Sequence, residues 1–222
     1  MKKIMFNDRY GLTAAVLNGD KTMTRRIIPL TDADQEYLNN AFDWDLRESV
    51  IIDRYAQYKV GEIVAVAQSY KDIGFPPDTI QTGRCVRQGS HCSDWDENMI
   101  GQLGDWYIDQ LAGWNNKMFV LADLMVSHIQ MTALKIERLQ DISNEDAMRE
   151  GIFKYDEPPL FHEFDPYSPW PPHVKPYKHD CDNKKYFCEA RFAFAHLIER
   201  VSRIGMWNIN PWVLAYSFER ID

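Results

Sequence analysis

The stretch Gly19-Asp20-Lys21-Thr22-Met23-Thr24-Arg25-Arg26 decides how this chain is interpreted, because it joins a predicted helix to a predicted strand. A glycine that follows a helical segment suits the left-handed conformation in which many helices end. The threonines and the isoleucines that come next favour an extended strand. The stretch therefore predicts a tight turn that leads into a strand rich in cations and hydroxyls.

Side chains alternate along a strand, so Thr22, Thr24 and Arg26 are expected on one face, and Met23, Arg25 and Ile27 on the other. Lys21 lies at the corner and can turn to either side. A row of two hydroxyls and a guanidinium beside an ammonium suits an anion or the polar edge of a small ring. An edge strand protected by surface charge would carry the same residues, and the stretch alone leaves both interpretations open.

Length and composition describe an ordinary globular protein. The 222 residues are 45% hydrophobic and 26% charged, which is enough chain for a substantial core. We expect a single domain over residues 1–222 with two insertions. No apolar stretch approaches the ~20 residues needed to cross a bilayer, and the N-terminus becomes polar too soon for a signal peptide. We therefore expect a cytoplasmic protein with no membrane partner.

The charge of the chain limits its nucleic-acid partners. A net charge of -8 and a pI near 5.3 argue against non-specific binding of duplex DNA, which needs a broad basic surface. A compact basic site in an acidic protein fits RNA or a modified nucleoside better. The sequence does not indicate an oligomeric state.

The cysteines form two pairs, each separated by six residues: Cys85 with Cys92, and Cys181 with Cys188. Zinc ligands within a pair are usually two to four residues apart, so free thiols are the expected state. His91 and His179 lie close to these pairs, which leaves a structural metal as the alternative. We expect no metal site and no cofactor.

The order of predicted elements indicates an α+β fold. Strands are expected at 1–6, 22–28, 59–70, 117–121, 127–139 and 213–221, and helices at 8–18, 33–48, 144–150 and 186–204. Residues 71–116 lose periodicity, and residues 152–184 contain seven prolines, so both are predicted to be irregular insertions. The natural packing is a small, mostly antiparallel β-barrel with flanking helices.

Two further polar side chains lie on predicted strands. Gln68 ends the apolar run 59–70, where it either reaches a ligand or meets solvent. In the later strand, His128, Gln130 and Thr132 alternate with apolar residues and form a polar row that is able to line a cavity. A single strand histidine is more often a structural hydrogen-bonding group than a ligand.

The stretch 19–26 resembles the signature of ASCH domains, a branch of the PUA-like superfamily of β-barrels. Gly61-Glu62 resembles the second element of that family, and residues 136–143 with Glu150-Gly151 resemble the third. The C-terminal Trp207 and Asn210-Pro211-Trp212 resemble ASCH-like proteins that phages and prophages often carry. The order and spacing of these motifs are more specific than any one of them.

The resemblance implies a PUA-like barrel whose cleft binds RNA or a modified nucleoside. The residues expected to contact the ligand are Thr22, Arg25, Arg26, Gln68, Gln130, Trp207, Asn210 and Trp212. The tryptophans would stack on a base, a contact worth ~1 to 3 kcal/mol.

One bacterial branch that the motif resembles consists of N4-acetylcytidine amidohydrolases. The resemblance implies that Lys21 and Thr24 are catalytic. That branch also uses a carboxylate on a middle strand, and the nearest position here is Gln130, a neutral amide, which departs from the pattern. An enzyme of this type would hydrolyse a non-peptide C–N bond.

The chemistry leaves both functions open; we expect binding of RNA or a modified nucleoside or nucleotide-like ligand, with amidohydrolase activity as the alternative. Burial beside Arg25 and Arg26 would lower the pKa of Lys21, Thr24 would be the nucleophile or hold the water, and Arg26 would steady the oxyanion. A carboxylate within hydrogen-bonding distance of Lys21 or Thr24 would favour catalysis, and its absence would favour binding alone. Three spare carboxylates are candidates: Glu62, Asp123 and Glu137. The third hypothesis is a phage-type adaptor that binds a protein through the segment rich in proline and aromatic residues.

Overall fold

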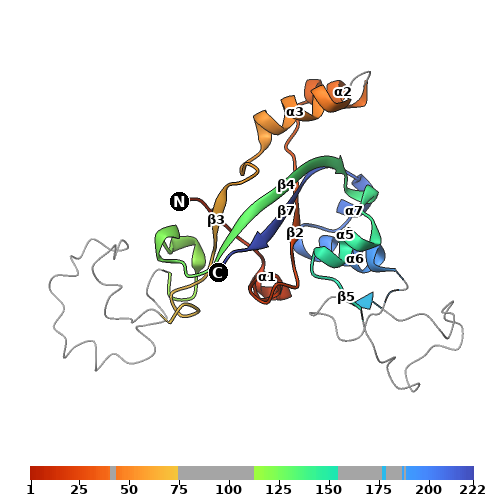
Figure 1. The fold of residues 1–222 in the computed structure, drawn as a ribbon. Helices are drawn as coiled ribbons and strands as arrows, with labels where there is room; N and C mark the ends of the chain where they lie inside the picture. The colour runs from red at the N-terminus through yellow and green to blue at the C-terminus, as the bar shows by residue number, and fades with distance from the viewer. Residues whose placement is uncertain (41–43, 75–112, 155–176, 179–186, 188) are drawn as a thin grey trace, which may run out of the picture. The chain divides into compact units, whose positions relative to one another are not determined.

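The computed structural model describes residues 1–40, 44–74, 113–154, 177–178, 187 and 189–222 (Figure 1). Most of the two predicted insertions lies outside these ranges. The same is true of all four cysteines and of His91 and His179, so the expectations for these residues stay predictions.

Five of the described strands pair into an open sheet (Figure 1). Its strands are β1 (Lys3–Ile4), β2 (Met23–Ile27), β3 (Ile63–Val66), β4 (His128–Arg138) and β7 (Trp212–Arg220), in the order β1-β3-β4-β7-β2. β1 and β3 are parallel, and β2 and β7 are antiparallel. A separate antiparallel pair joins β5 (Phe153–Lys154) to β6 (Tyr177–Lys178). The predicted α+β class with a mostly antiparallel sheet is confirmed, whereas the described strands form an open sheet and not the closed barrel that was expected.

The chain divides into two compact units by its internal contacts. The first consists of Met1–Phe6, Ile63–Ile129 and Asp222. It contains β1, β3 and two 3-10 helices, η4 (Lys117–Phe119) and η5 (Ala122–Leu124). Its small core is formed by Ala65, Ala67, Tyr70, Val120 and Met125.

The strand predicted at 117–121 is wrong, because η4 occupies most of it. The Asn116 side chain accepts a hydrogen bond from the Met118 amide and starts the 3-10 turn. The Lys3 ammonium then donates to the carbonyls of Lys117, Met118 and Val120. These carbonyls are satisfied without a neighbouring strand.

The second unit consists of Asn7–Glu62 and Gln130–Ile221. Strands β2 and β7 pair along their length, with Thr24 opposite Tyr216 and Arg25 opposite Ala215. The helical segments are η1 (Asp8–Tyr10), α1 (Leu12–Leu17), α2 (Asp32–Asn39), α3 (Trp44–Tyr55), η6 (Leu139–Asp141), α5 (Asn144–Arg149), α6 (Ala190–Val201) and α7 (Met206–Ile209). One apolar cluster packs α5 and α6 against β7 through residues such as Ala147, Phe194, Leu197 and Val213.

Helix boundaries follow the capping residues. Ser143 accepts a hydrogen bond from the Asp146 amide at the start of α5, and Gly151, with φ of 94°, follows its end, as predicted. The predicted helix 8–18 is instead divided at Gly11, whose φ is 66°, into η1 and α1. The predicted helix 33–48 is two helices, α2 and α3. Among the described helices, none is both long and apolar enough to cross a membrane.

Candidate functional site

The turn at residues 19–22 is held by the ends of two helices. Gly19 has φ of 83°, and the Lys21 amide donates to the carbonyl of Ala15 in α1. The Thr22 amide donates to the carbonyl of Arg149, the last residue of α5. These bonds place the side chain of Lys21 next to Glu150, the residue that caps α5.

Lys21 and Glu150 form a buried ion pair. The Lys21 Nζ lies 2.5 Å from Glu150 Oε2 and 2.8 Å from the Glu150 carbonyl oxygen, and the two side chains are 2% and 4% exposed. Burial lowers the pKa of Lys21 below its usual value. Glu150 opposes this shift, whereas the charges of Arg26 and Arg25 add to it. The neutral amine is therefore easier to reach here than in an exposed lysine.

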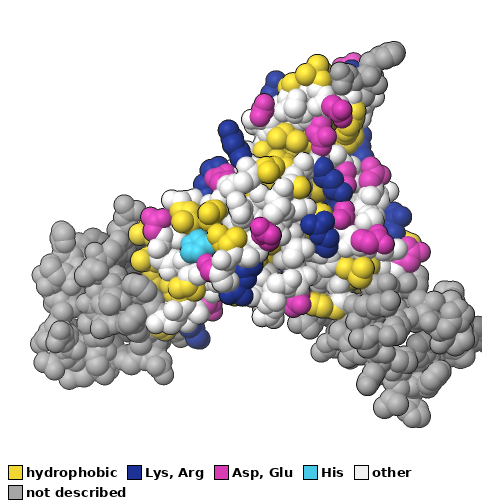
Figure 2. Space-filling view, viewed as in Figure 1, with side chains coloured by type: hydrophobic (Ala, Val, Ile, Leu, Met, Phe, Trp, Pro, Cys, Tyr) yellow, Lys and Arg dark blue, Asp and Glu magenta, His cyan; other side chains and the backbone are white. Residues whose placement is uncertain are grey.

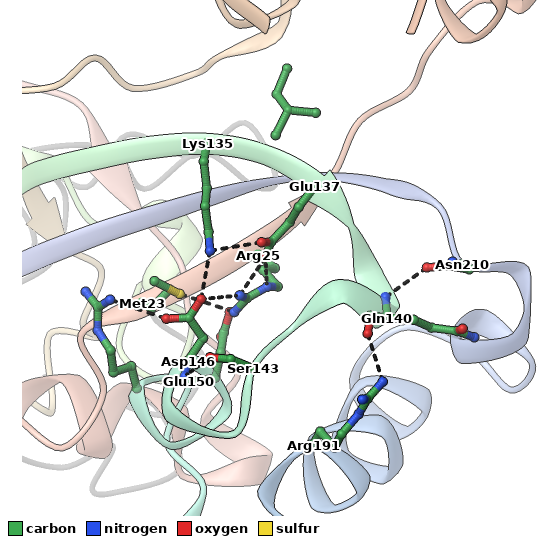
Figure 3. A network of polar contacts seen from close by, with 12 residues as sticks. Met23, Arg25, Lys135, Glu137, Gln140, Ser143, Asp146, Glu150, Arg191 and Asn210 are labelled. Atoms are coloured by element: carbon green, nitrogen blue, oxygen red, sulfur yellow. Dashed lines mark hydrogen bonds and ion pairs between the residues drawn. The ribbon is translucent and has the colours of Figure 1, made fainter. Parts of the chain in front are cut away.

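Arg25 is the hub of the surrounding network (Figure 3). Its Nη1 lies 3.0 Å from Glu150 Oε1, and its Nη2 lies 2.6 Å from Glu137 Oε1 and 3.1 Å from Asp146 Oδ2. The Arg25 Nε also donates to Glu137, at 2.7 Å, and the arginine side chain is 1% exposed. The planar guanidinium fork thus binds three carboxylates from β4, α5 and the end of α5.

An outer layer connects this hub to solvent. The Lys135 Nζ lies 2.9 Å from Glu137 Oε2 and 2.8 Å from Asp146 Oδ2, and Lys135 is 46% exposed. Burial lowers the pKa of Lys135, but the two carboxylates outweigh it and raise that pKa overall. Burial likewise raises the pKa of Asp146, but Lys135, Arg25 and Arg149 together lower it overall. Four cations therefore pair with three acids: Lys21, Arg25, Lys135 and Arg149 with Glu137, Asp146 and Glu150.

The predicted donor row is not assembled around Lys21. The lysine turns toward Glu150, the acid that also binds Arg25, and so toward the face of β2 that carries Arg25. Thr24 lies on the alternating face, opposite Tyr216, and is 6% exposed. Its hydroxyl forms no hydrogen bond with any described residue. The carboxylate at the end of α5 explains the direction that Lys21 takes.

The other donors of the motif are half-buried. The Thr22 hydroxyl accepts a hydrogen bond from Arg149 Nε at 3.4 Å. Arg26 is close enough for its charge to lower the pKa values of both Lys21 and Tyr58, although burial raises that of Tyr58 overall. Tyr58 packs edge to face on Tyr216, with ring centroids 5.6 Å apart. Arg25, in contrast, was expected to contact a ligand and instead binds protein carboxylates.

The two glutamines lie in different surroundings. Gln130 Nε2 donates to the Gly61 carbonyl at 3.3 Å, in the same unit as Lys21. Gln68 belongs to the other unit, where it is buried and its Oε1 has no hydrogen-bond partner among the described residues. His128 pairs with Asp222 at 2.5 Å, which agrees with the structural role expected for it.

The C-terminal motif has packing and capping contacts rather than an open stacking surface. Trp207 packs on Phe194, with ring centroids 6.5 Å apart. Asn210, with φ of 47°, accepts a hydrogen bond from the Gln140 amide at 2.8 Å. Trp212 is 9% exposed and lies between the Trp44 ring, at 5.5 Å, and the guanidinium of Arg138, at 4.2 Å. A base would have to displace these neighbours to stack on Trp212.

Sequence reasoning missed the roles of Glu150 and Asp146. Of the three spare carboxylates, only Glu137 joins the network; Glu62 accepts from the Lys59 amide, and Asp123 pairs with the N-terminus. The available signal was the Glu150-Gly151 pair of the third motif, since a glycine with positive φ ends α5 and fixes the preceding carboxylate. Within the described residues, no group of His, Cys, Asp and Glu side chains is arranged to hold a metal ion.

On the face seen in Figure 2, acidic and basic side chains are interspersed over the described residues. Comparison with known proteins finds no matching family model, no similar curated protein and no similar solved structure.

Proposed function

We propose that this chain is an amidohydrolase that acts on N4-acetylcytidine or a related N-acylated base, on a PUA-like barrel of the ASCH type. The observation that supports it is the buried pair of Lys21 and Glu150, whose charged atoms lie 2.5 Å apart. A carboxylate beside Lys21 is the feature that favours catalysis over binding alone. Glu150 supplies it, in place of the neutral Gln130.

In this proposal, Lys21 acts as the general base in its neutral form, which burial makes accessible. It removes a proton from a water molecule that attacks the acyl carbonyl carbon, and the C–N bond then breaks. The proton passes to the leaving amine, so that the products are the free base and a carboxylic acid, which releases its own proton to solvent. We expect the Thr24 hydroxyl to hold the water and Arg26 to stabilise the oxyanion, which requires the Lys21 side chain to turn from Glu150 toward the face of β2 that carries Thr24 and Arg26.

The second candidate is binding of RNA or a modified nucleoside without turnover. The observation that favours it is that both oxygens of Glu150 are engaged, one by Lys21 and one by Arg25. A fully paired network of this kind is also a common structural device. Under this candidate Thr24 and Arg26 would contact the ligand and no bond would break.

The test is incubation of the purified protein with N4-acetylcytidine, with cytidine followed by chromatography. Thr24 is outside the ion-pair network, so Thr24→Val removes its hydroxyl and leaves the charges in place. We expect Thr24→Val and Lys21→Met to abolish turnover and Thr24→Ser to retain part of it. Thr132→Val, at an exposed position of β4, is the matched control and should leave turnover unchanged.

If the wild-type protein releases no cytidine beyond the Lys21→Met background, the amidohydrolase proposal fails for this substrate. Saturable binding of the nucleoside or of RNA, lost in Thr24→Val, would then support the second candidate. Absence of both activities would leave the adaptor hypothesis, which depends on residues 152–184.

A further inference from the structure

We infer that Arg25 is a positioning residue that competes with Lys21 for Glu150 and thereby sets the charge of Lys21, and that Lys135 is the solvent-facing end of the same chain of ion pairs. The catalytic meaning of this inference rests on the proposed function. The electrostatic coupling of Lys135 and Arg25 to Lys21 does not rest on it, because the charge of a lysine is measurable without turnover.

The first step is the sharing of Glu150. One oxygen, Oε2, faces Lys21 Nζ at 2.5 Å, and the other, Oε1, faces Arg25 Nη1 at 3.0 Å. Both cations are almost completely buried, so water screens this competition poorly. Any movement of Arg25 away from Glu150 therefore strengthens the attraction between Glu150 and the Lys21 ammonium.

The second step is the sharing of Arg25. Its Nη2 is bound by Glu137 and Asp146, and these two acids are also bound by Lys135. Removal of the Lys135 charge would leave Glu137 and Asp146 with Arg25 as their main partner. Arg25 would then be drawn toward them and away from Glu150, so the pKa of Lys21 would rise.

Burial and the positive charges around Lys21 all lower its pKa, and Glu150 raises it. Lys21 faces Glu150, Arg25 and Arg26. Arg149, 42% exposed, also contacts Asp146, at 3.5 Å, and stays in place in the variants below. Loss of a positive charge from Lys135 or from Arg25 therefore favours the ammonium form of Lys21 by direct Coulomb interaction as well.

The test is the titration of the Lys21 side chain by NMR in the full-length protein labelled with ¹³C at lysine Cε, with the signal assigned through Lys21→Arg. In Lys135→Met we expect the pKa of Lys21 to rise by about 0.3 unit. Lys135→Arg keeps the charge and should restore the wild-type value. Lys59→Met, which removes an exposed lysine outside the network, is the matched control and should not shift it.

In Arg25→Met we expect a larger rise, of about 1 unit. If this buried variant fails to fold, the titration of Lys21 in Lys135→Met alone tests the inference. A Lys21 pKa that is the same in the wild type, Lys135→Met and any folded Arg25 variant would overturn the inference. If the enzyme is active, the alkaline shift must also appear in the pH profile of hydrolysis; an inactive wild type with a shifted Lys21 would refute the proposed function and leave the coupling intact.

Discussion

The Glu150→Gln variant tests how strongly the network stabilises the fold. Glutamine keeps the size of the side chain and removes its charge. Arg25 retains Glu137 and Asp146, but Lys21, which is 2% exposed, loses its carboxylate partner. Removing one member of a buried ion pair typically costs about 3 to 5 kcal/mol of stability.

An upper limit follows from the proton on Lys21. The variant can avoid a buried unpaired ammonium by releasing the proton, which costs about 1.4 kcal/mol for each pH unit below the unfolded-state pKa of 10.5. The cost of losing the charge on Glu150 is therefore at most about 5 kcal/mol at pH 7 and at most about 1 kcal/mol at pH 10. In the window between the lowered folded pKa and 10.5, the unfolded chain binds more protons than the folded one, so stability rises with pH.

The assay is urea unfolding followed by tryptophan fluorescence at both pH values. We expect Glu150→Gln to lose about 3 kcal/mol at pH 7 and to recover most of it at pH 10. Glu145→Gln, on the exposed first turn of the same helix, is the control and should stay within about 0.5 kcal/mol of the wild type. A loss below about 1 kcal/mol at pH 7, or one that does not change with pH, would refute this reasoning.

Three further predictions concern stability. Asp146→Asn should lower the free energy of unfolding by about 1 kcal/mol at pH 6. Because the folded pKa of Asp146 lies below 3.8, this difference should shrink as the pH falls below 3.8 and vanish below the folded pKa. Urea titrations across this range will measure it. Trp212→Ala should cost about 3 to 5 kcal/mol in the same assay, and a small cost with a large loss of ligand affinity would instead identify Trp212 as a stacking residue. Gly151→Ala should lower stability by about 1 to 2 kcal/mol, because alanine is strained at a φ of 94°. The new methyl group would meet Lys21 and Ala15 only at ordinary contact distances, so the backbone is the cause of the loss. An unchanged unfolding midpoint would contradict this.

Local sequence signals predicted much of the fold. Ser143 and Gly151 bracket α5, and Gly19 follows the last turn of α1, because capping and left-handed positions depend on residues close in sequence. The alternation in 127–139 likewise predicted β4. The strand expected at 117–121 failed because its carbonyls bind Lys3, more than a hundred residues away in sequence.

The candidate site was predicted only in part. The motif singled out Lys21, and the pKa of this residue is lowered by burial, as expected. Its partner was missed, because a carboxylate 129 residues later reaches Lys21 only where the Thr22 amide, just before β2, binds the carbonyl of Arg149 at the end of α5. The role of Arg25 was also mispredicted as ligand contact. Its three acidic partners come from segments that the sequence does not place beside it.

The most direct test of the central claim is the rate of cytidine release from N4-acetylcytidine as a function of pH. The account predicts turnover that rises with pH as Lys21 loses its proton, with no such rise in Lys21→Met. No release of cytidine by the wild-type protein above the Lys21→Met background, at any pH where both proteins are folded, would contradict it.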